Sequence, residues 1–212
     1  MIVERIVSKD DEKATVFFDN GEKLILHKDI LYQSGLRKGD EVSSDRFGFL
    51  NNQETLYLIK QKAFRLLQRR IHTSRELYIK LRQKFSDELL IKNCLNELKQ
   101  KGFINDREFA LAFISEKQKS KKWSKAKIKS ELIKRGVSNE IISEVLNQTF
   151  DTERETESAK ELAQKKLSQI IKKENDKRKL FQKIMMYLQS KGYDYEMSSE
   201  VVKKILKSDD ED

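Results

Sequence analysis

The chain has 212 residues, 37% of them charged and 37% hydrophobic, with no proline and a formal net charge of +9. It contains no apolar run of about 18 residues, so we expect no transmembrane helix, and its start alternates and is charged, so we expect no secretory signal peptide. This composition predicts a helical protein with large solvated faces and an anionic partner.

The first 45 residues differ from the rest because short runs of β-branched and aromatic residues predict three strands. Asn20-Gly21 predicts a two-residue hairpin turn with positive φ at both positions. A short helix near Lys28–Ser34 follows. We expect a small β-rich N-terminal cap over residues 1–45. His27 lies at its edge, and the only other histidine, His72, is distant in sequence, so a metal site is not expected.

From about Asp45 the apolar residues recur at helical spacing, which predicts helices over 52–70, 72–85 and 86–102. Ser86 is the expected N-cap of the third. Cys94 is the only cysteine and lies on the apolar face of that helix. A lone buried thiol forms no internal disulfide and favours a reducing cytoplasm.

The stretch KQKGFINDREFALAF, residues 99–113, ends one helix and begins another within a few residues. Gly102 fits the position after a helix C-terminus, where the backbone turns left-handed and a side chain is penalised. Asn105 can cap the next helix, with Glu108 three residues later. The pattern predicts a tight corner between two helices.

Similar corners return at Gly136 and Gly192, each between two apolar helices and each preceded by a further helix. The spacing of about 50 residues indicates a three-helix unit used three times, over 46–104, 105–150 and 151–212, the last with an acidic tail. We therefore predict a mostly α protein: three tandem three-helix repeats forming a curved solenoid, with the small β-rich N-terminal cap.

The repeats, the corner GFINDREFA (102–110) and a basic linker before KIKSELIKRGVS (127–138) together resemble the RecX family of bacterial proteins. The resemblance covers roughly residues 58–207. It implies a regulator of the RecA recombinase that binds the RecA–single-stranded-DNA filament and mainly inhibits its growth, ATP hydrolysis and strand exchange. It further implies a role in recombination, DNA repair and the SOS response. Where many members have Gly-Pro before the second helix of the middle repeat, this chain has WSKAK, in which Ser124 can cap the helix.

The positive charge is concentrated in the middle of the chain. Residues 58–150 hold 22 Lys/Arg and 10 Asp/Glu, whereas the two ends are acidic or neutral. That asymmetry predicts binding of single- and double-stranded DNA without sequence preference, although solvated helix faces also carry charge runs. The sharpest group, called here the lysine segment, comprises Lys117, Lys119, Lys121, Lys122, Trp123, Lys125, Lys127 and Lys129.

Trp123 has two open interpretations: it stacks on a base or partner, or it fills the core between repeats while the lysine stems shield it. A second group around the first repeat, called here the arginine group, comprises Arg65, Arg69, Arg70, Arg75, Arg82 and Lys84. Arg135 is a further candidate, although Lys84 and Arg135 lie at helix ends, where complementing the helix dipole already explains them.

The sequence has no phosphate-binding glycine-rich loop, no Cys/His cluster at zinc spacing and no nucleophile–base pattern. We therefore expect no catalysis, no cofactor and no metal, and we expect a monomer. Two other functions remain open. One is a free-standing basic helix-turn-helix protein that binds nucleic acid, and the other is a helical scaffold for acidic proteins.

Overall fold

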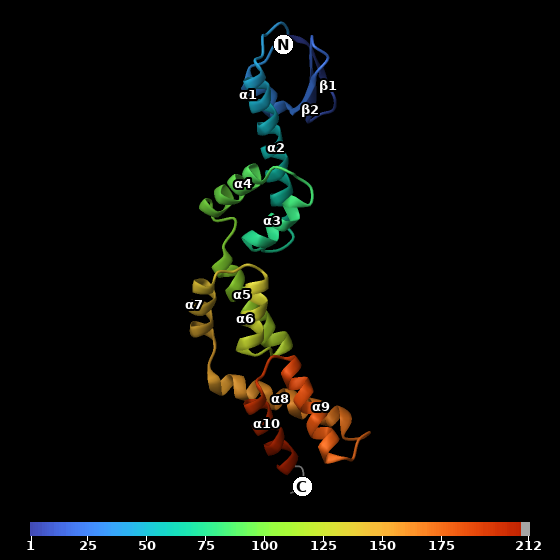
Figure 1. Ribbon diagram of the computed structural model, residues 1–212, viewed down its shortest axis with the longest axis vertical. Helices are drawn as coiled ribbons and strands as arrows, with labels where there is room; N and C mark the ends of the chain where they lie inside the picture. The colour runs from blue at the N-terminus through green and yellow to red at the C-terminus, as the bar shows by residue number, and fades with distance from the viewer. Residues whose placement is uncertain (209–212) are drawn as a thin grey trace. The chain divides into compact units, whose positions relative to one another are not determined.

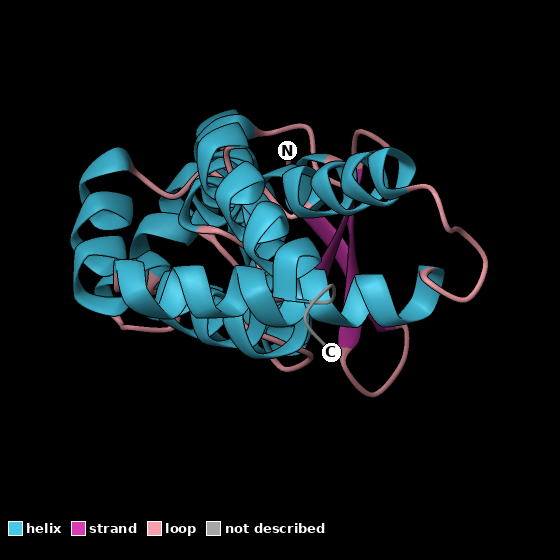
Figure 2. Cartoon of the chain, turned by 90° about the horizontal axis from the view of Figure 1, so that it is seen from below, coloured by secondary structure: helices cyan, strands magenta, loops and turns pink. Residues whose placement is uncertain are grey.

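The computed structural model describes residues 1–208, and the predicted acidic tail over 209–212 lies outside the described residues. Within residues 1–208, strands occur only in the first 27 residues, and helices make up most of the remainder (Figures 1 and 2). The fold class is therefore the predicted one: a mostly α protein with tandem three-helix repeats and a small N-terminal sheet.

The described chain forms two compact units. One comprises residues 1–72 and 76–104, and the other comprises Thr73–Arg75 and everything described from Asn105 onward. The first unit contains β1 (Val3–Ser8), β2 (Lys13–Phe18), β3 (Lys23–His27), α1 (Lys28–Ser34), α2 (Ser44–Leu67), most of α3 (Ser74–Arg82) and α4 (Glu88–Gln100).

The N-terminal sheet is antiparallel in the order β1-β2-β3. The predicted hairpin turn differs from expectation, because only Gly21 has positive φ, at 83°. The amide of Gly21 donates to the carbonyl of Phe18, and the amide of Phe18 donates to the carbonyl of Glu22. This is a three-residue loop with glycine in the left-handed position, the other common way to close a hairpin.

Helix α2 begins at Ser44, eight residues before the predicted start, because Ser43 accepts a hydrogen bond from the amide of Arg46 as N-cap. Its first turns join the core of the sheet through Leu50, and its later turns join the core of the first repeat through Ile59. One helix thereby serves both cores. Glu54 fastens it to the sheet, since one carboxylate oxygen accepts the amide of His27 at 2.7 Å.

Helix α4 begins one residue later than predicted, because Asp87, and not Ser86, caps it and accepts from the amide of Leu90. Cys94 is fully buried in the core of the first repeat, as expected. Burial raises the pKa of its thiol to about 11. A neutral thiol in an apolar core is unreactive near neutral pH.

The second unit holds two three-helix groups. The first consists of α5 (Asp106–Lys121), α6 (Lys125–Lys134) and α7 (Asn139–Thr149), and the second of α8 (Thr152–Ile170), α9 (Lys177–Ser190) and α10 (Tyr195–Ser208). Each group has its own buried cluster of aliphatic and aromatic side chains. Asn105 caps α5 by accepting from the amides of Arg107 and Glu108, as predicted.

The three corner glycines all have the predicted left-handed backbone, with φ of 76° at Gly102, 78° at Gly136 and 93° at Gly192. They differ in their surroundings. A methyl group at Gly102 would meet nothing within 4 Å, whereas at Gly192 it would lie 2.4 Å from Cβ of Lys127 and 2.6 Å from Oγ of Ser124. Gly192 therefore packs directly against the start of α6.

Candidate nucleic-acid interface

The lysine segment occupies the end of α5, the three-residue connection 122–124 and the start of α6. Lys122 ends α5 with a left-handed backbone, φ 48°, which is unfavourable for a residue that carries a side chain. Two contacts from the last three-helix group hold it. The hydroxyl of Tyr193 donates to the Lys122 carbonyl at 2.9 Å, and the Lys122 ammonium pairs with Glu161. The connection between α5 and α6 is thus fixed.

Ser124 caps α6, as predicted, by accepting from the amide of Lys127 at 3.2 Å. Its own amide donates to the carbonyl of Lys191, the residue before Gly192, at 3.1 Å. The amide of Lys125 donates to a carboxylate oxygen of Glu155 at 2.7 Å. Helix α8 and the α9–α10 corner therefore both contact the start of α6. The negative charge of Glu155 is favourable there, because it lies at a helix N-terminus.

Trp123 is half-buried and packs against the buried cluster of the middle group. Its ring lies 6.3 Å from that of Phe113, which in turn stacks on Phe109 at 6.0 Å. The ammonium of Lys117 lies 5.6 Å from the Trp123 ring, and that of Lys127 lies 5.8 Å from it. Trp123 thus packs against the core of the middle group with two lysine ammonium groups near its ring, while part of the side chain stays accessible.

Arg135, at the end of α6, also covers this aromatic cluster. Its guanidinium lies 5.0 Å from the Phe113 ring, and its backbone carbonyl accepts the hydroxyl of Thr73 at 2.7 Å. Cations over aromatic faces contribute modestly to stability at partly exposed sites. Lys117, Lys127 and Arg135 therefore have packing roles in addition to any binding role.

The remaining charge of the lysine segment is largely uncompensated. Lys117 pairs with Glu116 at 2.6 Å, and Lys122 pairs with Glu161. Over residues 1–208 no ion pair forms at the other five lysines: Lys119, Lys121, Lys125, Lys127 and Lys129. Lys119, Lys121 and Lys129 are exposed. Five cations that form no ion pair within the described residues thus lie within eleven residues, which makes this segment strongly positive.

The arginine group does not form one comparable surface. Arg70 pairs with Glu76 at 2.8 Å, and Arg82 donates to the carbonyls of Phe85 and Ser86 and lies 3.4 Å from Glu88. The side chains of Arg70 and Arg82 are thus engaged just after the C-terminal end of α2 and at that of α3. Arg65 donates to Gln61 at 3.3 Å.

Other members of the arginine group are more open. Lys84 is exposed and lies 5.9 Å from the Phe85 ring. Arg69 is also exposed. Arg75 belongs to the second compact unit, where its side chain packs beside Gly136.

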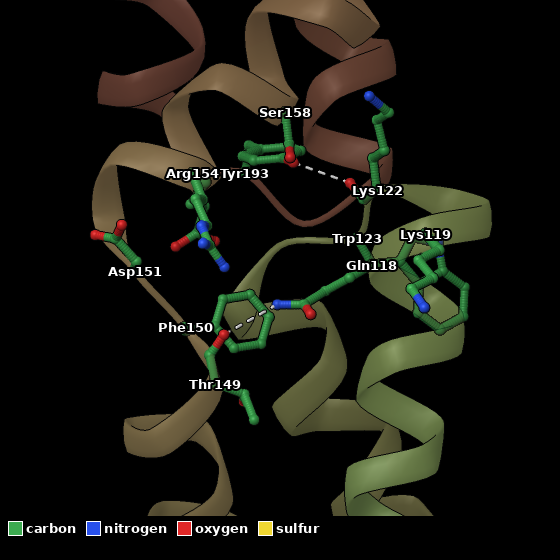
Figure 3. Close-up of a pocket in the computed structure, with 11 residues that line it drawn as sticks. Gln118, Lys119, Lys122, Trp123, Thr149, Phe150, Asp151, Arg154, Ser158 and Tyr193 are labelled. Carbon is green, nitrogen blue, oxygen red and sulfur yellow. Dashed lines mark hydrogen bonds between the residues drawn. The ribbon is translucent and has the colours of Figure 1, made fainter.

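A cavity of about 220 Å³ adjoins the lysine segment and was not anticipated from the sequence. It is called here the α5–α8 cavity. Figure 3 shows Gln118 and Arg154 pointing toward the ring of Phe150, with Tyr193 and Ser158 on one side. Three segments far apart in the sequence line the cavity: 118–123, 149–158 and Tyr193. Burial, and secondarily the charge of Glu155, raises the pKa of Tyr193, so its hydroxyl stays protonated.

The segments that carry the lysine segment and the α5–α8 cavity match models of one protein family. Residues 105–146 match the family model described as RecX, second three-helix domain, and residues 153–202 match RecX, third three-helix domain. The Regulatory protein RecX of Clostridium beijerinckii is 32% identical over 207 residues, covering 98% of this chain and 96% of that protein. That of Clostridium botulinum (strain Eklund 17B) is 31% identical over 201 residues, covering 95% and 93%. The chain belongs to the RecX family.

Solved RecX structures agree with the fold. A crystal structure of regulatory protein RecX aligns over 96% of this chain and 98% of its own, with a TM-score of 0.72 and 20% identity. The RecX structure from Lactobacillus salivarius aligns over 72% of this chain and 97% of its own, with a TM-score of 0.61 and 22% identity. The lysine segment lies in the part matched to the second RecX domain.

Within the described residues of this chain, no helix is both long and apolar enough to span a bilayer. Over the same residues, no three His, Cys, Asp or Glu side chains are grouped so that they could hold a metal ion.

Proposed function

We propose that this protein is a non-enzymatic regulator that binds the RecA–single-stranded-DNA filament and mainly inhibits filament growth, ATP hydrolysis and strand exchange. The observation that carries the proposal is the set of five lysines without carboxylate partners, on a segment matched to the second RecX domain. The protein would act as a monomer in the cytoplasm, in recombination, DNA repair and the SOS response.

The geometry of the lysine segment suits a phosphate backbone. Lysine ammonium groups neutralise phosphates and release bound counterions, which supplies affinity without reading the base sequence. The connection that carries them is held by Tyr193 and Glu161, so little ordering is needed on binding. Lys125 lies at the start of α6, where positive charge opposes the helix dipole, so folding alone does not favour it.

Several weak contacts suit a filament better than one strong pocket. A filament presents the same protein and DNA surfaces repeatedly, and contacts from tandem helical groups add through effective concentration. The arginine group would then supply further contacts through exposed members that form no ion pair within the described residues, such as Arg65, Arg69 and Lys84.

Binding measurements with three targets test the proposal: the recombinase filament on single-stranded DNA, the same DNA without recombinase, and the recombinase without DNA. We expect the tightest binding to the filament, weak and sequence-tolerant binding to DNA, and the weakest binding to recombinase alone. Equal affinity for filament and naked DNA, or one strongly preferred duplex sequence, would favour the free-standing helix-turn-helix function instead.

A further inference from the structure

The α5–α8 cavity combines an aromatic wall with unpaired cations. Phe150 is half-buried at the end of α7, and Figure 3 shows its ring facing the side chains of Gln118 and Arg154. Arg154 on α8 and Lys119 on α5 also line the cavity, and Figure 3 shows Arg154 near the Phe150 ring and Lys119 beside Trp123. Both are exposed, and within the described residues neither forms an ion pair. The lining of the cavity therefore combines an aromatic ring with two cations that form no ion pair within the described residues.

The acidic residues of the cavity already have partners. Asp151 caps α8 by accepting from the amide of Glu153, and Glu155 accepts the amide of Lys125. Lys122, the third cation, is paired with Glu161. Arg154 and Lys119 are thus the cations of the cavity that form no ion pair within the described residues, and they can receive an anionic group at the rim.

The polar groups of the cavity suit a heterocycle. The amide nitrogen of Gln118 makes one long hydrogen bond, 3.5 Å, to the carbonyl of Thr149. An amide side chain offers both donors and an acceptor, the groups that read the edge of a base. An apolar cavity of about 150 Å³ is large enough to bind benzene, so about 220 Å³ admits a single heterocyclic ring.

We propose that the α5–α8 cavity binds one unstacked base of single-stranded DNA. The base stacks on Phe150, Gln118 contacts its edge, and Arg154 and Lys119 contact the flanking phosphates. Lys119, Lys122 and Trp123 of the lysine segment line the cavity, so a strand bound along that segment passes the site. The inference rests on the proposed function in one respect, that single-stranded DNA is a ligand.

A base fits these groups better than an acidic side chain of a protein partner. A carboxylate would use the two cations but would leave the Phe150 ring and the Gln118 amide without a role. A nucleotide uses all of them, because every base has a π-face and aromatic side chains are the usual stacking platforms for single strands.

The test compares a short oligothymidylate with an abasic deoxyribose-phosphate oligomer of equal length and charge. Affinity is measured by anisotropy with the full-length protein, together with the emission of Trp123, the only tryptophan, which lines the cavity. The wild type should bind the thymidylate at least about fivefold more tightly, because stacking one base contributes about 5- to 150-fold. Only the thymidylate should change the Trp123 emission.

Two variants localise the effect. Phe150→Leu keeps apolar volume and should reduce the preference for the thymidylate by about fivefold or more. Arg154→Gln should weaken thymidylate binding more than Lys165→Gln, a matched loss of one exposed cation from the same helix. If Phe150→Leu does not fold, the Arg154→Gln comparison decides, because Arg154 is exposed and makes no packing contribution to a core cluster.

Three results would overturn the base site. The first is an unchanged preference for the thymidylate in Phe150→Leu. The second is an equal loss of thymidylate affinity in Arg154→Gln and Lys165→Gln. The third is normal DNA binding by Phe150→Leu and Arg154→Gln together with loss of their effect on the filament. The last result would assign the cavity to a protein group. Failure of the wider function is distinguishable, because it would leave the Phe150-dependent preference intact while the wild type has no effect on the recombinase.

Discussion

Replacing Gly192 with alanine should destabilise the second compact unit by much more than a typical surface change. The left-handed backbone, φ 93°, costs alanine about 1–2 kcal/mol. The new methyl group would lie 2.4 Å from Cβ of Lys127 and 3.0 Å from its backbone nitrogen, so the corner and α6 must separate. Overpacking of this kind costs about 1–3 kcal/mol.

The same displacement should weaken the cap of α6. The methyl group would lie 2.6 Å from Oγ of Ser124, the atom that accepts from the amide of Lys127. Loss of a serine cap costs about 1 kcal/mol. The total for Gly192→Ala is therefore about 3–6 kcal/mol in the free energy of unfolding.

The assay is urea denaturation followed by Trp123 emission, which reports on the second unit because the chain has one tryptophan. Gly102→Ala is the matched control, since its methyl group would meet nothing within 4 Å. Gly102→Ala should lose only about 1–2 kcal/mol of unfolding free energy, and Gly102→Val should lose the same amount or slightly more. Labelling of Cys94, the single buried thiol of the first unit, measures the loss of unfolding free energy in both Gly102 variants.

A double-mutant cycle isolates the contact between the Gly192 corner and the α6 cap. Ser124→Ala should cost about 1 kcal/mol in the wild type and less in the Gly192→Ala background, where the cap is already disturbed. Equal losses for Gly192→Ala and Gly102→Ala, or strict additivity with Ser124→Ala, would refute the packing argument.

The remaining predictions concern charge, the aromatic core and the thiol. The triple variant Lys121→Gln, Lys125→Gln, Lys129→Gln should weaken DNA binding at near-physiological salt by roughly tenfold or more while leaving the unfolding free energy nearly unchanged, as anisotropy and urea denaturation will show. If about five phosphates are neutralised, log affinity for single strands should fall with log salt at a slope near −3.5, and a flat response would contradict the electrostatic account. Trp123→Ala should cost about 2–4 kcal/mol by thermal unfolding, because the ring packs on Phe113, and unchanged stability would instead make it purely a contact residue. Burial raises the pKa of Cys94 to about 11, so the thiol stays protonated in the folded state at pH values where the unfolded thiol ionises. The free energy of unfolding should therefore fall as the pH rises from the unfolded thiol pKa toward 11. Cys94→Ala should remove that part of the pH dependence.

Local chemistry in the sequence predicted the repeat corners well. A glycine between two apolar helical stripes has few alternatives to a left-handed C-terminal position, and Gly102, Gly136 and Gly192 all adopt it. Asn105 caps α5 and Ser124 caps α6, as predicted. In each case the residues that decide the geometry are neighbours in the chain.

Choices between adjacent residues of similar chemistry were less predictable. Ser86 and Asp87 are both good caps, and the sequence alone does not distinguish them; in the structure Asp87 caps α4. Asn20-Gly21 fits two turn types, and the strand register selects the one with a single left-handed residue. These misses shift an element by one residue and leave the fold unchanged.

The candidate site was only partly predictable. The lysine segment is contiguous in the sequence, so its charge could be recognised directly. The pairing of Lys122 with Glu161 and the packing of Trp123 depend on tertiary contacts. Arg154 and Phe150 were missed altogether, because a half-buried aromatic and a lone arginine acquire meaning only where α5, α7 and α8 bring them to one cavity.

The central claim, regulation of the recombinase filament, is tested most directly by the DNA-dependent ATPase of the cognate recombinase, titrated with this protein at near-physiological salt. The wild type should suppress ATP hydrolysis in a concentration-dependent manner, and the triple lysine variant should need roughly tenfold more protein for the same suppression. ATP hydrolysis that stays constant across the wild-type titration would contradict the proposed function. Equal suppression by the triple variant would remove the lysine segment from the contact surface.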